Sequence, residues 1–152
     1  MNVLISKNAE LFYKALEDIW AAEQTWNGSP NIAVWHCTQA AEKVMKGLLR
    51  IFNRDYEYEH KLRTLFEDVE SVIKVTDECK AYILHLDTYE NRLRYRTSPN
   101  DPSPEDAQIA ITRTKHIINE LTTNPKISQS MDEAREVHLK VLKVNLQKTF
   151  DN

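Results

Sequence analysis

The sequence predicts an all-α fold, an up-and-down bundle of about five helices followed by an additional C-terminal helix. The 152 residues include only two glycines, whereas turn-rich β folds use glycine repeatedly for positive φ angles. Apolar residues recur at steps of three and four along most of the chain, which is the period of an amphipathic helix. The longest uninterrupted apolar runs, such as 32–35, are four residues long, far below the ~20 residues of a membrane span.

Composition and charge narrow the possible function classes. Hydrophobic residues make up 41% of the chain and charged residues 28%, which is typical of one folded domain rather than of a disordered segment. A net charge of −3 argues against a general nucleic-acid-binding surface, because such a surface is cationic. The N-terminal residues show no basic segment followed by a long apolar core. No signal peptide is therefore predicted, and we expect a cytoplasmic protein.

The first two predicted helices are separated by a short turn. The first spans about residues 8–26 and ends at Asn27-Gly28. Ser29 then supplies a cap, and Pro30 supplies a φ angle suited to a first helical turn. The second helix is therefore expected to start there and to run to about residue 53. Each has an inward apolar stripe: Leu11, Phe12, Ala15, Leu16, Ile19, Trp20 and Trp26 in the first, and Ala33, Cys37, Ala40, Val44, Leu48 and Ile51 in the second.

Three more core helices are expected at about residues 61–74, from 77 onward, and at 104–123. The run 72–75 could also form a strand, but no second strand is available to pair with it, so it is assigned to the third helix or to its frayed end. The fifth helix follows a proline-containing loop and starts with a capping serine, Ser103, a first-turn proline and two acids. Asn124-Pro125 is predicted to end it.

Residues 126–152 are expected to form an accessory helix that packs on the bundle of residues 1–125. A capping-box pattern at 130–133 predicts its start, and Phe150 lies near its predicted end. It has two apolar stripes, about 100° or more apart around the axis: Ala134, Val137, Val141 and Val144, and Leu139, Leu142, Leu146 and Phe150. A helix with so much apolar surface needs more than one covering surface, so we expect the second stripe to lie in a homodimer interface. The alternative is that a bent first helix covers this stripe within one chain.

The sequence lacks the common catalytic and metal-binding motifs. It has no glycine-rich phosphate loop, no GxSxG elbow and no HExxH. Cys37 and Cys79 lie outside any CxxC spacing, so they are predicted to be buried apolar residues. A di-iron bundle needs two Glu-x-x-His pairs on helices, and the chain offers only Glu57-x-x-His60, before a helix. We expect neither a metal nor another cofactor.

Two basic clusters suggest ligand binding, because guanidinium and ammonium groups bind phosphate by charge-assisted hydrogen bonds. The first shares one face of the second helix, about 20 Å long at 1.5 Å per residue: His36, Gln39, Lys43, Lys46 and Arg50. The second lies where the fourth helix ends: Arg92, Arg94, Tyr95 and Arg96. Either cluster could instead be structural, as a solvated helix face or as the basic end of a helix dipole.

Several segments resemble the HEPN family, named for higher eukaryotes and prokaryotes nucleotide-binding domains. The string at 33–49, AVWHCTQAAEKVMKGLL, is similar to the signature of the family's second helix. His60-Lys61-Leu62 resembles its His-x-Leu at the start of the next helix. Leu93-Arg94-Tyr95 resembles its Ala-Arg-Tyr-Pro segment, with Arg96 in place of proline, and 103–106 resembles the start of its last core helix. The resemblance covers roughly residues 5–122.

This resemblance implies a small helical bundle that is commonly dimeric. It implies either nucleotide binding or association with a minimal nucleotidyltransferase encoded nearby, in a toxin–antitoxin-like or substrate-binding role. A large subset of the family are metal-independent endoribonuclease toxins that carry Arg, four to six residues, and then His. In that pair the histidine moves protons and the arginine stabilises charge on the phosphoryl oxygens.

The nuclease pair is incomplete in this sequence. Arg94 lies in the expected region, but residues 99–101 are Pro, Asn and Asp, so the histidine is missing. One literal match, Arg54 and His60, lies between the second and third helices and is interpreted as a coincidence. A metal-independent ribonuclease that uses Arg94, His60 or Arg54 is therefore the alternative hypothesis.

The leading hypothesis is a HEPN-type module that binds a nucleotide or a nucleotidyltransferase-like partner. We expect the stripe on the second helix to face Arg94 across a groove between the second and fourth helices. The residues assigned to nucleotide or anion binding are His36, Gln39, Lys43, Lys46, Arg92, Arg94, Tyr95 and Arg96.

Overall fold

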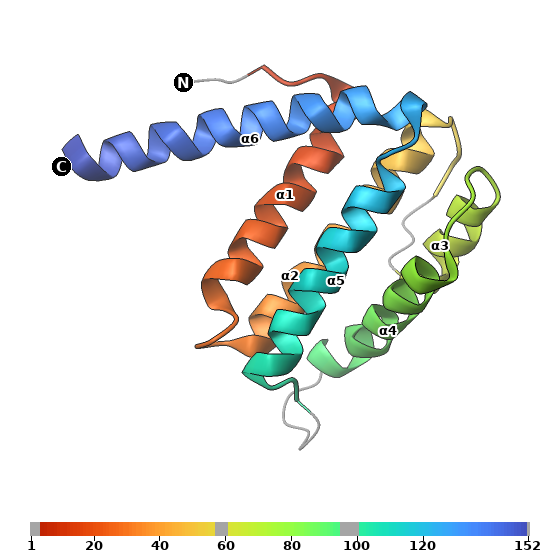
Figure 1. Ribbon diagram of the computed structural model, residues 1–152, viewed down its shortest axis with the longest axis horizontal. Helices are drawn as coiled ribbons and strands as arrows, with labels where there is room; N and C mark the ends of the chain where they lie inside the picture. Colours follow the sequence, from red (N-terminus) through yellow and green to blue (C-terminus); the bar gives the residue numbers. More distant parts are fainter. Residues whose placement is uncertain (1–3, 57–60, 95–100, 152) are drawn as a thin grey trace.

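The computed structural model describes residues 4–56, 61–94 and 101–151. Within these ranges the backbone forms six α-helices and no strand (Figure 1). The helices are α1 (Lys7–Thr25), α2 (Pro30–Ile51), α3 (Leu62–Glu70), α4 (Asp77–Arg94), α5 (Pro104–Leu121) and α6 (Pro125–Asp151). The prediction of an all-α fold with an additional C-terminal helix is confirmed.

Five helices form the bundle, and the sixth lies across its end (Figure 1). α1, α2, α4 and α5 run up and down beside one another, and the short α3 packs against α2 and α4. α2 is the central element because it contacts each of the other helices. α6 packs mainly on α1, and its C-terminal part extends past the bundle. None of the described helices carries an apolar stretch long enough to cross a membrane.

Sequence signals set the helix ends in most places. Ser103 begins α5 with a full capping box, in which its hydroxyl accepts from the Asp106 N–H (3.1 Å) and its own N–H donates to the Asp106 carboxylate (3.0 Å). Pro30 occupies the first turn of α2, as expected for a residue with no N–H to satisfy. The predicted start of α5 and of α2 is confirmed.

The third helix is shorter than the sequence predicts. It ends at Glu70 rather than near residue 74, because Ser71 makes a turn in which its hydroxyl donates to the Asp68 carbonyl (2.6 Å). Such a side-chain bond competes with continuation of the helix, and the apolar period alone does not reveal it. Residues 72–75 form neither helix nor strand. The prediction that the third helix runs to about residue 74 is therefore wrong.

α6 begins at Pro125, earlier than the capping-box pattern at 130–133 predicts. The Asn124 side chain accepts a hydrogen bond from the Lys126 N–H (2.9 Å) and so starts this helix. Glu133 was predicted to belong to a capping box. Its carboxylate instead accepts hydrogen bonds from both the N–H (2.9 Å) and the hydroxyl (2.7 Å) of Ser6. Because Ser6 is the residue before α1, Glu133 ties α6 to the start of α1.

The inward stripes of α1 to α5 meet in one core. The α2 stripe is fully buried from Ala33 to Leu48, as predicted. Trp20 is an exception, since it is 46% exposed although the spacing places it on the inner side of α1. Ile19, which was also predicted to face inward, is buried, and Trp20 lies about 100° further around the helix axis.

α1 packs tightly against α2 where Phe12 meets Gly47. Phe12 is fully buried, and a Cβ atom built at position 47 would lie 2.8 Å from Cε1 of its ring. Real carbon atoms do not approach so closely without repulsion. Glycine is therefore required at position 47 by packing, since it leaves room for the ring.

We predict that Gly47→Ala lowers the free energy of unfolding by about 1–2 kcal/mol in urea titrations. Overpacking a core costs about 1–3 kcal/mol, and the better helix propensity of alanine offsets up to ~1 kcal/mol of it. Gly28→Ala is the control, because nothing lies within 4 Å of a Cβ atom there. Equal effects of the two substitutions would show that Phe12 does not require the gap at position 47.

Candidate functional site

A single carboxylate joins α1 to α2. Asp18 is only 7% exposed and lies on the side of α1 that faces α2. Its Oδ1 atom lies 2.8 Å from Nδ1 of His36, and its Oδ2 atom accepts from Nζ of Lys43 at 2.5 Å. Burying a carboxylate costs desolvation free energy unless the group is paired and hydrogen-bonded. The two partners of Asp18 offset this cost. We call these three residues the Asp18 cluster.

Helical spacing explains how the Asp18 cluster forms. His36 and Lys43 are seven residues apart, so they lie on the same side of α2 two turns apart. Asp18 lies between Ala15 and Ala22, both fully buried, at steps of three and four. The sequence pattern identifies the two bases but not the acid. Asp18 could have been identified in the sequence as an acidic residue within the apolar stripe of an amphipathic helix.

The other cations of the α2 stripe also have partners. Lys46 Nζ lies 3.3 Å from the carboxylate of Glu42, which is 6% exposed, and 5.7 Å from the ring centre of Tyr56. Arg50 donates to the Lys7 carbonyl (3.2 Å) and to the Tyr56 hydroxyl (3.3 Å). Gln39 is half-buried on the same helix. Much of the positive charge predicted for this face is therefore balanced by acids of the same chain.

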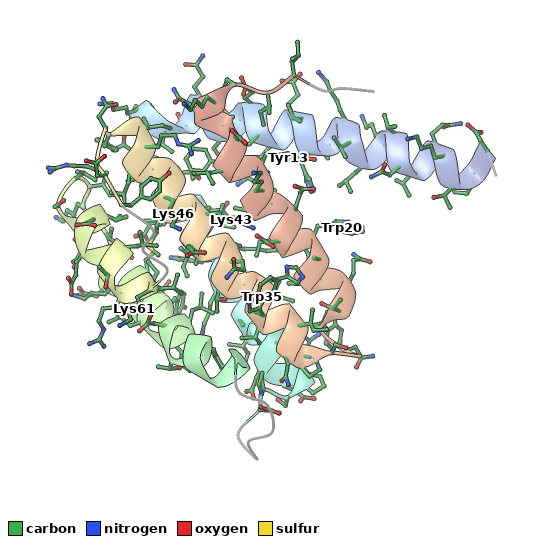
Figure 2. The ribbon with its side chains drawn as sticks, turned by 180° about the vertical axis from the view of Figure 1, so that it is seen from behind. Tyr13, Trp20, Trp35, Lys43, Lys46 and Lys61 are labelled. Carbon is green, nitrogen blue, oxygen red and sulfur yellow. The ribbon has the colours of Figure 1, made fainter. Side chains whose placement is uncertain are left out.

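A groove of about 740 Å³ opens next to the Asp18 cluster, between α1, α2 and α6. Asp18, His36 and Lys43 all contribute to its lining. The rest is largely apolar, with Tyr13 and Trp20 from α1 and Val141, Leu142 and Leu146 from α6. Figure 2 shows Tyr13 and Trp20 on α1, with Lys43 on the neighbouring α2.

The predicted groove between α2 and α4 is not the arrangement found. His36 and Lys43 turn toward α1, because Asp18 binds both of them. Arg94 is the last residue of α4, and Figure 2 shows Lys43 and Lys46 along α2. His36 and Lys43 therefore do not face α4 as predicted, and a contribution of Arg94 to a binding site stays a prediction.

The structure leaves part of the predicted site untested. Arg92 and Arg94 lie at the end of α4, beyond the last side chain described in that helix. Tyr95, Arg96 and His60 lie outside the described residues. Arg54 is exposed just after α2. An anion-binding role for the end of α4 and a nuclease role for these residues stay predictions.

The cysteines supply no nucleophile. Both are free and buried, as predicted. Burial raises the pKa of each thiol to about 12, and the nearby Glu120 also raises that of Cys79. Since the thiolate is the reactive form, both side chains are inert at neutral pH. Across the described ranges, no three His, Cys, Asp or Glu side chains gather as a metal site requires.

Comparison with known proteins identifies the family. The family model of the HEPN domain matches residues 9–124. The chain belongs to the HEPN family. The matched segment ends at the residue before α6, so this helix is an addition to the HEPN domain.

Solved structures agree with this assignment of the fold. An archaeal HEPN homologue, ST0689, is 19% identical and has a TM-score of 0.62 over 77% of this chain and 96% of its own. The protein TT1696 from Thermus thermophilus is 18% identical and has a TM-score of 0.68 over 77% of this chain and 97% of its own. No curated protein sequence matches the chain. At these identities the likeness extends to the helical HEPN fold.

We predict that Asp18→Asn lowers the free energy of unfolding by about 1.5–3 kcal/mol at pH 7, the range for a hydrogen bond to a charged group. The substitution keeps the shape of the side chain but removes the charge that Lys43 and His36 face. Glu10→Gln is the matched control, because it neutralises an exposed acid 3.5 Å from Lys14. Exposed pairs of this kind contribute at most about 1 kcal/mol. If urea titrations give both variants the same small loss, the Asp18 cluster does not stabilise the fold.

Proposed function

We propose that this HEPN domain is a binding module for a protein partner, with a minimal nucleotidyltransferase encoded beside it as the candidate partner. The observation that carries the proposal is the internal pairing of the α2 cations. Asp18 already holds Lys43 and His36, and Glu42 holds Lys46. A phosphate group would have to compete with these carboxylates. A protein surface with mixed charge and apolar side chains fits the same face without breaking the pairs.

The recognition surface in this proposal is the outer face of α2. Ile32 and Trp35 are 49% and 45% exposed, one turn apart on this helix. The Trp35 ring packs edge-on against His36, with 4.9 Å between ring centres, and Asp18 in turn holds His36. Figure 2 shows Trp35 and Lys46 along this helix. A positioned, half-exposed tryptophan beside charged groups is typical of the anchors that dominate protein interfaces.

If the partner is a nucleotidyltransferase, the domain could have one of two roles. The domain would either restrain the partner in a toxin–antitoxin-like pair or present a substrate to it. In both roles the domain itself carries out no reaction. Nucleotide binding by Arg92, Arg94, Tyr95 and Arg96 would be a second contribution of the module.

Co-purification with the neighbouring nucleotidyltransferase tests the proposal. We expect the wild-type domain to retain this protein, and Trp35→Ala and Ile32→Ala to weaken the complex at least tenfold because they remove apolar contacts from the outer face of α2. Ile109→Ala is the matched control, since Ile109 is 48% exposed but lies on α5. Retention that is unchanged by Trp35→Ala, or lost equally with Ile109→Ala, would contradict the assignment of this surface.

The competing function, a metal-independent ribonuclease, has its own test. Purified protein is incubated with unstructured RNA in EDTA, and we expect no cleavage above a buffer control. Cleavage that disappears in both Arg94→Ala and His60→Ala would overturn the proposal of binding without catalysis. Cleavage that survives both substitutions would instead indicate a contaminating nuclease.

A further inference from the structure

We propose that the groove between α1, α2 and α6 binds an uncharged small molecule that combines an apolar body with a hydroxyl group. One side of the groove comes from α6, which is an addition to the HEPN domain, so the site belongs to this chain rather than to the domain alone. Ile32 and Trp35 of the outer face of α2 do not line it. The inference therefore goes beyond the proposed function.

The groove has the size and the apolar character of a small-molecule site. Its volume of about 740 Å³ lies within the range of roughly 300–1,000 Å³ that is typical of ligand pockets. Tyr13 and Trp20 present aromatic rings from α1, and Trp20 is 46% exposed in the folded chain. Val141 and Leu142 supply aliphatic surface from α6. A ligand with an apolar body would remove this surface from water.

The charges that line the groove balance one another. Lys14 and Lys43 contribute two cations, and Glu17 and Asp18 contribute two anions. Burial lowers the pKa of His138, the histidine that α6 places in the groove, although Glu17 partly opposes this shift. This ring is therefore neutral at pH 7. A charged ligand would lose its hydration without gaining an unpaired counter-charge, whereas an uncharged ligand avoids that cost.

The Asp18 cluster supplies the hydrogen-bonding groups of this largely apolar lining. Nδ1 of His36 and Nζ of Lys43 each bind Asp18, which leaves the second ring nitrogen of His36 and two N–H groups of Lys43. Within the described part of the chain, these remaining groups make no hydrogen bond. A hydroxyl both donates and accepts, so it can bind the ammonium group and either tautomer of the ring. The cluster therefore favours a hydroxyl on the apolar ligand.

Calorimetric titration of the full chain with naphthylmethanol at pH 7 tests the class of ligand. Naphthoate and naphthylmethylammonium carry the same rings with a negative and a positive charge, and methylnaphthalene lacks the hydroxyl. We expect naphthylmethanol to bind at least tenfold more tightly than either ion, and several-fold more tightly than methylnaphthalene. Equal affinity for any of the three analogues would overturn the assignment of an uncharged hydroxyl compound, as would no binding of naphthylmethanol at its solubility limit.

Two further measurements locate the bound probe. In proton–nitrogen NMR spectra of the wild type, naphthylmethanol should shift the indole N–H resonance of Trp20 but not the amide resonance of Ile109. Trp20→Ala should weaken binding at least fivefold because it removes an aromatic wall, with unchanged far-UV circular dichroism. Ile109→Ala is the control, since Ile109 is 48% exposed on α5 and should not affect binding. An unshifted Trp20 resonance, or equal affinities of the two variants, would overturn the placement in the groove.

Discussion

The close contact between α1 and α2 underlies the charge arrangement of the candidate site. Gly47 lets the Phe12 ring lie directly on the α2 backbone, and this approach places Asp18 of α1 within reach of α2. At a larger separation between the helices, water would enter and the carboxylate would bind solvent. At the observed separation Asp18 is buried and needs partners from α2, which His36 and Lys43 supply. The charge arrangement of the candidate site is therefore a consequence of packing.

Because helix packing pairs the α2 cations with acids, the basic stripe on α2 has a different role from the one its spacing suggests. A row of cations at helical spacing can be either an anion-binding surface or a solvated helix face, and the sequence alone leaves both interpretations open. In the folded chain, acids that the stripe does not include, Asp18 and Glu42, balance its charge. What α2 presents outward is a mixed-charge face with Trp35 held in place, and such a face is better suited to a protein than to a phosphate chain.

Local signals were sufficient to predict most of the fold and only part of the site. Apolar period and caps located α1, α2 and α5, and they predicted the exposed Leu139, Leu146 and Phe150 of α6. Asn124-Pro125 was misleading because proline is favoured both after a helix and in the first turn of the next one. Asp18 was missed because only contact with another helix explains an acid in an apolar stripe. The relative placement of α4 and the α2 stripe also depends on topology, which spacing along one helix does not reveal.

The most direct test of this view is to titrate inorganic triphosphate into the wild type and into Asp18→Asn at low salt and to measure binding by calorimetry. If the Asp18 carboxylate already satisfies His36 and Lys43, the wild type should bind triphosphate weakly. Asp18→Asn should bind it at least tenfold more tightly, with an affinity that falls as salt is added. The opposite result would contradict the account: tight binding by the wild type that Lys43→Ala abolishes would show that the cations of α2 are available to anions in the native protein.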